Sequence, residues 1–192
     1  MNFLKNKYLF FFVLTTILLM TSPLHPFGNG FTGIDSSVFI YIGKSITNGQ
    51  FPYVDFFDHK GILIYLLDFV GYSFAGNTGI WLVEFLFLYT SIFFCYKIAR
   101  LFTEKIPSII ATTIVFILFG RYLQEGNLVE EYAVPMIFIS LYLFIKYFLN
   151  GYIFNTKSAI ITGFCLGFVV MLRPNMIAVW AVFYPIIFIH LL

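Results

Sequence analysis

The stretch GIDSSVFIYIGKSITNGQFPYVDFFDHKG, which runs from Gly33 to Gly61, decides how the rest of the chain is arranged. It lies between the first two long apolar runs and concentrates these ionisable side chains: Asp35, Asp55, Asp58, His59 and Lys60. Charged groups held beside an apolar phase are costly and usually serve a function. Binding or chemistry is therefore expected first in this stretch.

The composition of the whole chain is that of a membrane protein. Hydrophobic residues make up 60% of the 192 residues, charged residues make up 10%, and the mean hydropathy is +0.92. A soluble domain is about a quarter charged, and a chain of this length has too little core to hide so much apolar surface from water. The net charge of +2 is too small to indicate nucleic acid as a partner.

Apolar runs separated by turn residues predict an all-α fold, a polytopic transmembrane helical bundle. Six segments are expected to span the membrane, at about 8–24, 79–99, 107–121, 131–149, 158–172 and 175–192. The outer loop 25–78 is expected to hold two interfacial helices, at 35–48 and 61–76. The first ends at Asn48-Gly49 and is too short to cross about 30 Å of hydrocarbon.

The positive-inside rule supports this order of spans. One side, predicted to be the cytoplasm together with the N-terminus, receives Lys5, Lys7, Lys97, Arg100, Lys105, Lys146 and Lys157. The opposite side receives Asp35, Asp55, Asp58, Asp68, Glu125, Glu130 and Glu131, with Glu84 near the same end of its helix. The basic residues there are Lys44, Lys60, Arg121 and Arg173. A full span at 61–76 would scatter the lysines over both sides.

Three motifs in the loop carry a family resemblance: Gly33-Ile34-Asp35, Gly49-Gln50-Phe51-Pro52-Tyr53 and Asp55-Phe56-Phe57-Asp58-His59-Lys60-Gly61. They resemble the first outer loop of GT-C-fold membrane glycosyltransferases, and more narrowly the bacterial protein mannosyltransferase and aminoarabinose transferase group. The Glu130-Glu131 pair and the Arg173-Pro174-Asn175 break are similar to later positions of that family. Ile62 departs from the pattern, which often has Pro after Lys-Gly.

The resemblance implies transfer of a sugar from a polyprenyl-phosphate carrier to a glycan or envelope-polymer acceptor at the outer face of the cell membrane. It implies Asp35 as the base that activates the acceptor hydroxyl, with Asp55 and Asp58 as further catalytic candidates. The residues implied in substrate binding are His59, Lys60, Glu130, Glu131 and Arg173; Lys60 and Arg173 suit the lipid phosphate. Some members of the fold use a divalent cation and others none, so Asp55, Asp58 and His59 stay candidate metal ligands.

Structural roles remain open for the same residues. Asp35 is also expected as a helix N-cap, Lys60 as a snorkelling interfacial lysine, and Arg173 as a helix-end anchor. The Glu130-Glu131 pair also suits the positive end of a helix.

Enzymes of this fold are longer, so the chain is expected to be the N-terminal half of such an enzyme, truncated at its C-terminus or completed by a separate chain. The alternative function is a non-enzymatic polytopic membrane protein, a transporter or flippase component or a scaffold fragment.

Overall fold

The computed structural model describes residues 6–28, 32–120 and 126–191. Within these ranges the chain forms seven α-helices, one short 3-10 helix and no β-strand, which confirms the all-α prediction. The elements, in order, are α1 (Lys7–Leu19), α2 (Ile34–Ile46), α3 (Ile62–Ala99), α4 (Lys105–Gly120), α5 (Val129–Leu149), α6 (Thr156–Leu172), η2 (Pro174–Met176) and α7 (Ala178–Leu191).

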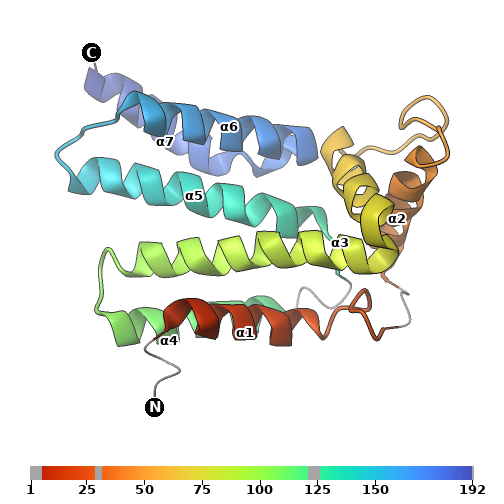
Figure 1. The fold of residues 1–192 in the computed structure, drawn as a ribbon. Coiled ribbons are helices and arrows are strands. Elements are labelled where there is room, and N and C mark those ends of the chain that lie inside the picture. Colours follow the sequence, from red (N-terminus) through yellow and green to blue (C-terminus); the bar gives the residue numbers. More distant parts are fainter. Residues whose placement is uncertain (1–5, 29–31, 121–125, 192) are drawn as a thin grey trace.

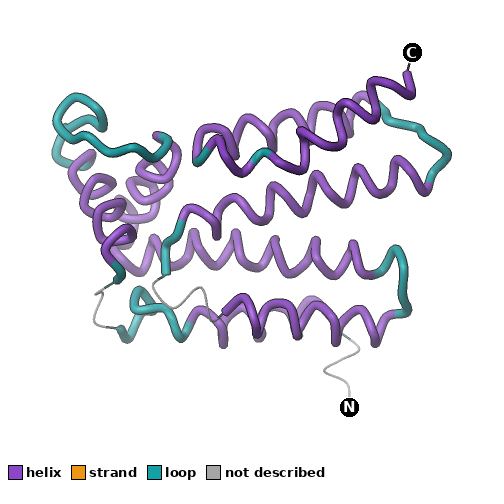
Figure 2. Tube along the Cα trace, turned by 180° about the vertical axis from the view of Figure 1, so that it is seen from behind, coloured by secondary structure: helices purple, strands orange, loops and turns teal. Residues whose placement is uncertain are grey.

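The long helices lie side by side, with their axes roughly parallel (Figure 1). The order across the bundle is α1 and α4 at one side, then α3, then α5, then α6 and α7 at the other side. Helix α2 and the first part of α3 stand across one end of this bundle, as Figure 2 shows from behind. We call α2, residues 47–61 and the first part of α3 (62–75) the cap.

Helix α3 combines two elements that the sequence predicted separately, at 61–76 and 79–99. The backbone is non-helical at Ala75 (φ −152°) and Gly76 (φ +59°), so the two parts meet at a sharp kink. Glycine is required where they meet, because a Cβ added to Gly79 would lie 1.9 Å from the carbonyl oxygen of Gly71. The kink folds the first part back over the end of the bundle.

Two apolar cores hold these layers together. One joins the cap to α5, α6 and α7, and includes Phe39, Tyr65 and Trp180. The other lies between α1, α3 and α4, and includes Phe11 and Trp81. Both buried indoles are satisfied, since the Nε1–H of Trp81 donates to the carbonyl of Leu19 and that of Trp180 to the carbonyl of Thr162.

The outward faces of the bundle are also apolar. Ile114 on α4, Phe164 on α6 and Phe188 on α7 are each more than half exposed. Two helices, Ile62–Ala99 and Val129–Leu149, are long and apolar enough to cross a membrane. Four other apolar helices have 10–17 residues. Long apolar helices also form the cores of soluble proteins, so six membrane spans stay a prediction.

Charges collect at the two ends of the bundle. The end formed by the α3–α4 and α5–α6 turns carries Lys97, Arg100, Lys105, Lys146 and Lys157. We call it the basic end. The end covered by the cap carries the acidic residues of the cap and of the start of α5. Lys5, Arg121 and Glu125, which also entered the sidedness argument, lie outside the described residues.

Candidate functional site

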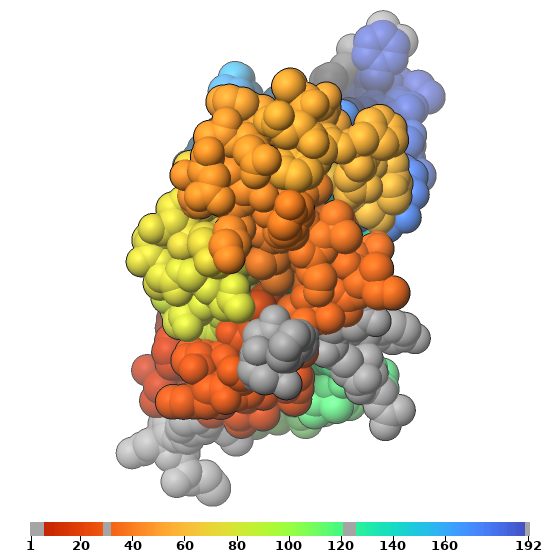
Figure 3. All heavy atoms as spheres, turned by 90° about the vertical axis from the view of Figure 1, so that its right-hand side faces the viewer, coloured from red at the N-terminus to blue at the C-terminus, as the bar shows by residue number. Residues whose placement is uncertain are grey.

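The cap loop, residues 47–61, is shaped by its own hydrogen bonds. The backbone N–H of Phe51 donates to the carboxylate of Asp55 at 2.7 Å, which closes a turn. The hydroxyl of Tyr53 donates to the carbonyl of Lys60 at 2.5 Å, with Tyr53 itself in the left-handed region at φ +65°. Figure 3 shows this loop and α2 covering the end of the molecule. Asp55 therefore stabilises the turn in this structure.

Asp58 anchors the loop to α3. One of its oxygens accepts from the hydroxyl of the buried Tyr65 at 2.7 Å. The other accepts from the backbone N–H of His59 at 2.6 Å and lies 2.9 Å from Nδ1 of that imidazole, which is exposed. Burial, and next the hydrogen bond to Asp58, raise the pKa of Tyr65 far above its usual range. The Tyr65 hydroxyl thus stays a donor to Asp58.

The tertiary fold brings Asp35 and Lys60 together. The Nζ of Lys60 lies 3.4 Å from Oδ2 of Asp35 and 5.8 Å from the centre of the Phe39 ring. The Lys60 side chain is only 8% exposed, whereas that of Asp35 is 61% exposed. The sequence also allowed Asp35 as an N-cap, and this is wrong: Gly33 is the N-cap, and Asp35 lies in the first turn of α2. Its carboxylate is therefore free to face solvent.

The cap loop ends against the end of α6. The backbone N–H of Gly61 donates to the carbonyl of Leu172 at 3.0 Å, and a Cβ on Gly61 would lie 1.9 Å from the carbonyl oxygen of Met171. Lys60 precedes Gly61 in the chain, and Arg173 follows Leu172. Arg173 forms an ion pair with Glu130 at the start of α5. Two cationic residues from distant parts of the sequence are therefore brought to the cap end.

The predicted metal ligands do not converge. Asp58 and His59 are in contact, but the carboxylate of Asp55 is bound to the backbone of Phe51. Among residues 6–28, 32–120 and 126–191, no three His, Cys, Asp or Glu side chains are grouped so that they could hold a metal ion.

Glu131 lies apart from its neighbour Glu130. Its side chain is buried, and its carboxyl group meets that of Glu84 on α3. The structure therefore does not place Glu131 among the exposed residues that a substrate could reach. Sequence reasoning did not single out Asn127, which is buried between Glu84 and Asp68. The signal in the sequence that could have indicated this buried site was the presence of acidic residues inside apolar helices.

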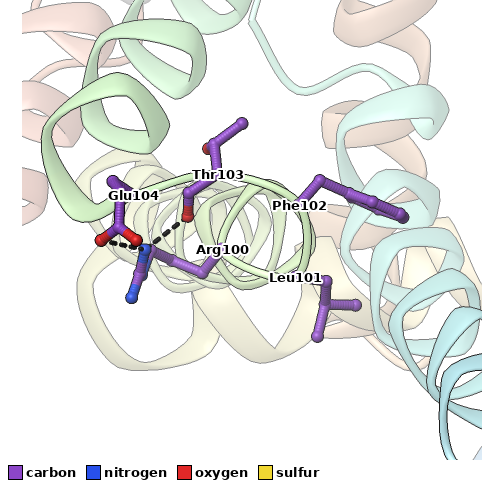
Figure 4. Close-up of a pocket in the computed structure, with 5 residues that line it drawn as sticks. All are labelled: Arg100, Leu101, Phe102, Thr103 and Glu104. Atoms are coloured by element: carbon purple, nitrogen blue, oxygen red, sulfur yellow. Dashed lines mark hydrogen bonds and ion pairs between the residues drawn. The ribbon is translucent and has the colours of Figure 1, made fainter.

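A separate hollow lies at the basic end, lined by residues 100–104 (Figure 4). The guanidinium of Arg100 donates to the carbonyl of Thr103 and lies 3.8 Å from the carboxylate of Glu104. These contacts close the short α3–α4 turn. The hollow is at the opposite end of the bundle from the cap and contributes nothing to the site there.

A family model described as competence-induced protein Ccs4 N-terminal domain matches residues 2–192. No curated protein and no solved structure matches the chain. Since the match covers nearly the whole sequence, the chain belongs to the family of the competence-induced protein Ccs4 N-terminal domain.

Proposed function

We propose that the chain is a polytopic membrane domain with six spans, its N-terminus in the cytoplasm and its cap on the extracytoplasmic side. The apolar outward faces of α4, α6 and α7 support this, because exposed apolar surface of that extent marks contact with lipid or a partner. The separation of basic and acidic ends supports the orientation, since cytoplasmic loops are rich in Lys and Arg. In this arrangement 79–99 spans the membrane and 62–75 lies at its surface.

For the cap we propose glycosyl transfer from a polyprenyl-phosphate sugar to an acceptor of the cell envelope. The observation that carries the proposal is the position of Lys60, which is paired with Asp35 and lies next to Gly61 in the cap loop. The hydrogen bond of Gly61 to Leu172 brings Arg173 to the same end of the bundle. Lys and Arg are the side chains that bind phosphate oxygens best. The exposed carboxylate of Asp35, next to Lys60, can accept the proton of an incoming hydroxyl.

The reaction would run as a displacement at the sugar. The acceptor oxygen forms a bond to the anomeric carbon, the bond between that carbon and the phosphate oxygen breaks, and the proton of the acceptor hydroxyl passes to Asp35. The lipid phosphate leaves with the bonding electron pair and is held by Lys60 and Arg173. Both cations have carboxylate partners in the structure, Asp35 and Glu130. Phosphate binding at Lys60 would thus release Asp35 for the acceptor.

The test separates donor binding from transfer. Binding of polyprenyl phosphate is measured on the purified protein in lipid nanodiscs, and transfer of labelled sugar to the envelope is measured in cells. A hydrogen bond to a charged group is worth about 1.5–3 kcal/mol, so Lys60→Gln should weaken phosphate binding roughly 10- to 100-fold. Asp35→Asn should retain binding and lose transfer. Lys44→Gln, which removes a charge at the opposite end of α2, is the matched control.

Equal binding of polyprenyl phosphate to the wild type and to Lys60→Gln would refute the phosphate site. Unchanged sugar transfer by Asp35→Asn would refute the base.

The second candidate function is a non-enzymatic membrane protein, a transporter or flippase component. It is favoured by the buried carboxyl groups of Asp68, Glu84 and Glu131, because ionisable residues inside membrane helices often line ion pathways. Flux of a charged solute into vesicles that contain the protein, with no sugar transfer, would favour this function over the first.

A further inference from the structure

Three carboxyl groups are buried together where the kink of α3 meets the first turn of α5. Asp68, from the first part of α3, is 0% exposed, Glu84, from the second part, is 1% exposed, and Glu131, from α5, is 4% exposed. The three belong to neither ion pair of the cap end. Burying a carboxyl group without full hydrogen bonding is costly. A buried carboxyl group of this kind is therefore a candidate for a functional role.

Asn127 bridges the two parts of α3. Its backbone N–H donates to Glu84 at 2.6 Å, and its side-chain amide donates to Asp68 at 2.9 Å. Its carbonyl oxygen accepts from the hydroxyl of Tyr132 at 2.5 Å. Asn127 is fully buried and lies in the left-handed region at φ +56°, a conformation that Asn tolerates better than most residues. Asn127 therefore holds the kink in place.

The number of donors is too small for three carboxylates. One oxygen of each group, Oδ1 of Asp68, Oε2 of Glu84 and Oε1 of Glu131, is buried without a donor. The carboxyl groups of Glu84 and Glu131 are within hydrogen-bonding contact of each other. A carboxylate has no hydrogen to donate, so two carboxyl groups form a hydrogen bond only when one of them carries a proton.

No cation replaces that proton among the residues that the structure describes. The ion pairs formed there involve other residues, and the titratable groups facing the pair are Asp68 from the cap side and Tyr132 from α5. Gly43 of α2 packs against Asp68, and Ser22, from the chain after α1, lies with Glu84 beside Gly126. The contact between Glu84 and Glu131 therefore depends on a shared proton.

We propose that the Glu84–Glu131 pair is a proton-binding site that controls how the cap is seated on the bundle. With the proton bound, the two carboxyl groups are joined by a hydrogen bond, and Asn127 holds the kink. When the proton leaves, two like charges face each other in a poorly solvated site, with Asp68 beside them. Repulsion in such surroundings is strong. Movement of the first part of α3 relieves it, because it takes Asp68 away from the pair and admits water to both charges. The cap carries Asp35 and Lys60, so this movement would alter the geometry at the cap surface.

Infrared spectroscopy tests the proton directly on the full chain in lipid. A buried protonated carboxyl group gives a C=O stretching band that a carboxylate lacks. We expect this band in the wild type at acidic pH, its loss as the pH is raised, and its reduction in the Glu84→Gln/Glu131→Gln variant. The matched control is Glu104→Gln, whose carboxylate is 93% exposed at the basic end and should leave the band unchanged. A wild type without a pH-sensitive band would overturn the proposal, even if the double variant does not fold.

Distance measurement between spin labels tests the coupling. Labels are attached through Val38→Cys on α2 and Ile160→Cys on α6, both at exposed positions, in a background with Cys95→Ser and Cys165→Ser. We expect the distance distribution of the otherwise wild-type protein to broaden or shift when the proton is lost. The Glu84→Gln/Glu131→Gln variant should keep one narrow distribution at all pH values. Identical wild-type distributions at acidic and alkaline pH would overturn the coupling. Neither measurement depends on glycosyl transfer.

Discussion

Replacing Asn127 by alanine should remove much of the stability of the domain. The substitution deletes the side-chain hydrogen bonds to Asp68 and Tyr132, whose side chains are both 0% exposed. Each lost bond leaves a buried polar partner unsatisfied, at about 1–3 kcal/mol. Alanine at φ +56° adds roughly 1–2 kcal/mol of backbone strain. The expected loss in the free energy of unfolding is therefore about 3–8 kcal/mol, a large share of the 5–15 kcal/mol that is typical of a folded domain.

Denaturant unfolding in detergent micelles measures this loss through the fluorescence of Trp81, which lies on α3 near the kink. Asn127→Gly separates the two contributions, because glycine adopts positive φ without strain but also lacks the amide. Asn155→Ala is the surface control, since Asn155 caps α6 by accepting from the N–H of Ser158 and such a cap is worth about 1 kcal/mol. If Asn127→Ala destabilises the protein no more than Asn155→Ala does, the bridge does not hold the kink.

Three further predictions concern the kink of α3, the tyrosine that binds the cap loop, and the packing of that loop against the end of α6. Gly79→Ala should prevent tight closure of the α3 kink and lower the yield of folded protein. Gly163→Ala is the control, because a Cβ there meets nothing within 4 Å; thermal unfolding should show it neutral or stabilising by up to about 1 kcal/mol. The pKa of Tyr65 is raised on folding, so its stabilising effect is complete below the ordinary tyrosine value of about 10 and is lost as pH rises through the folded value. Ultraviolet titration should therefore show the same number of tyrosines ionising in the ordinary range in the wild type and in Tyr65→Phe, and a loss of one in the variant would contradict the raised pKa. Gly61→Ala should push the loop off the end of α6 and expose Lys60 to amine-reactive reagents, and unchanged labelling would contradict the proposed seat.

The helices themselves were largely predictable from the sequence. Apolar runs and turn residues predict segments at 107–121, 131–149 and 158–172, and the structure has α4, α5 and α6 in nearly the same places. Asn48-Gly49 correctly marks the end of α2 within a few residues. These features are predictable because burial of apolar side chains and the conformational preferences of Gly, Asn and Pro act locally along the chain.

The candidate site was predictable only as a set of residue types. The charges of the loop stood out against an apolar background and drew attention to Asp35 and Lys60, while the family resemblance drew attention to Arg173. Their partners did not follow from the sequence: Asp55 is bound to the backbone of Phe51, Asp58 to the hydroxyl of Tyr65, and Glu130 to Arg173. Partners that are 43 residues apart, such as Glu130 and Arg173, leave no periodic pattern in a sequence.

The sequence by itself determined that the chain is helical, that its charges divide between two ends, and that the stretch from Gly33 to Gly61 is the unusual polar segment. Hydrophobicity and turn preference carry that information residue by residue. Only the tertiary structure decided that Lys60 meets Asp35 beside Arg173, and that Glu131 turns inward to Glu84 while Glu130 stays at the surface. The reason is the kink at Gly76, which folds the first part of α3 onto α2 and the end of the bundle and so selects which distant residues become neighbours.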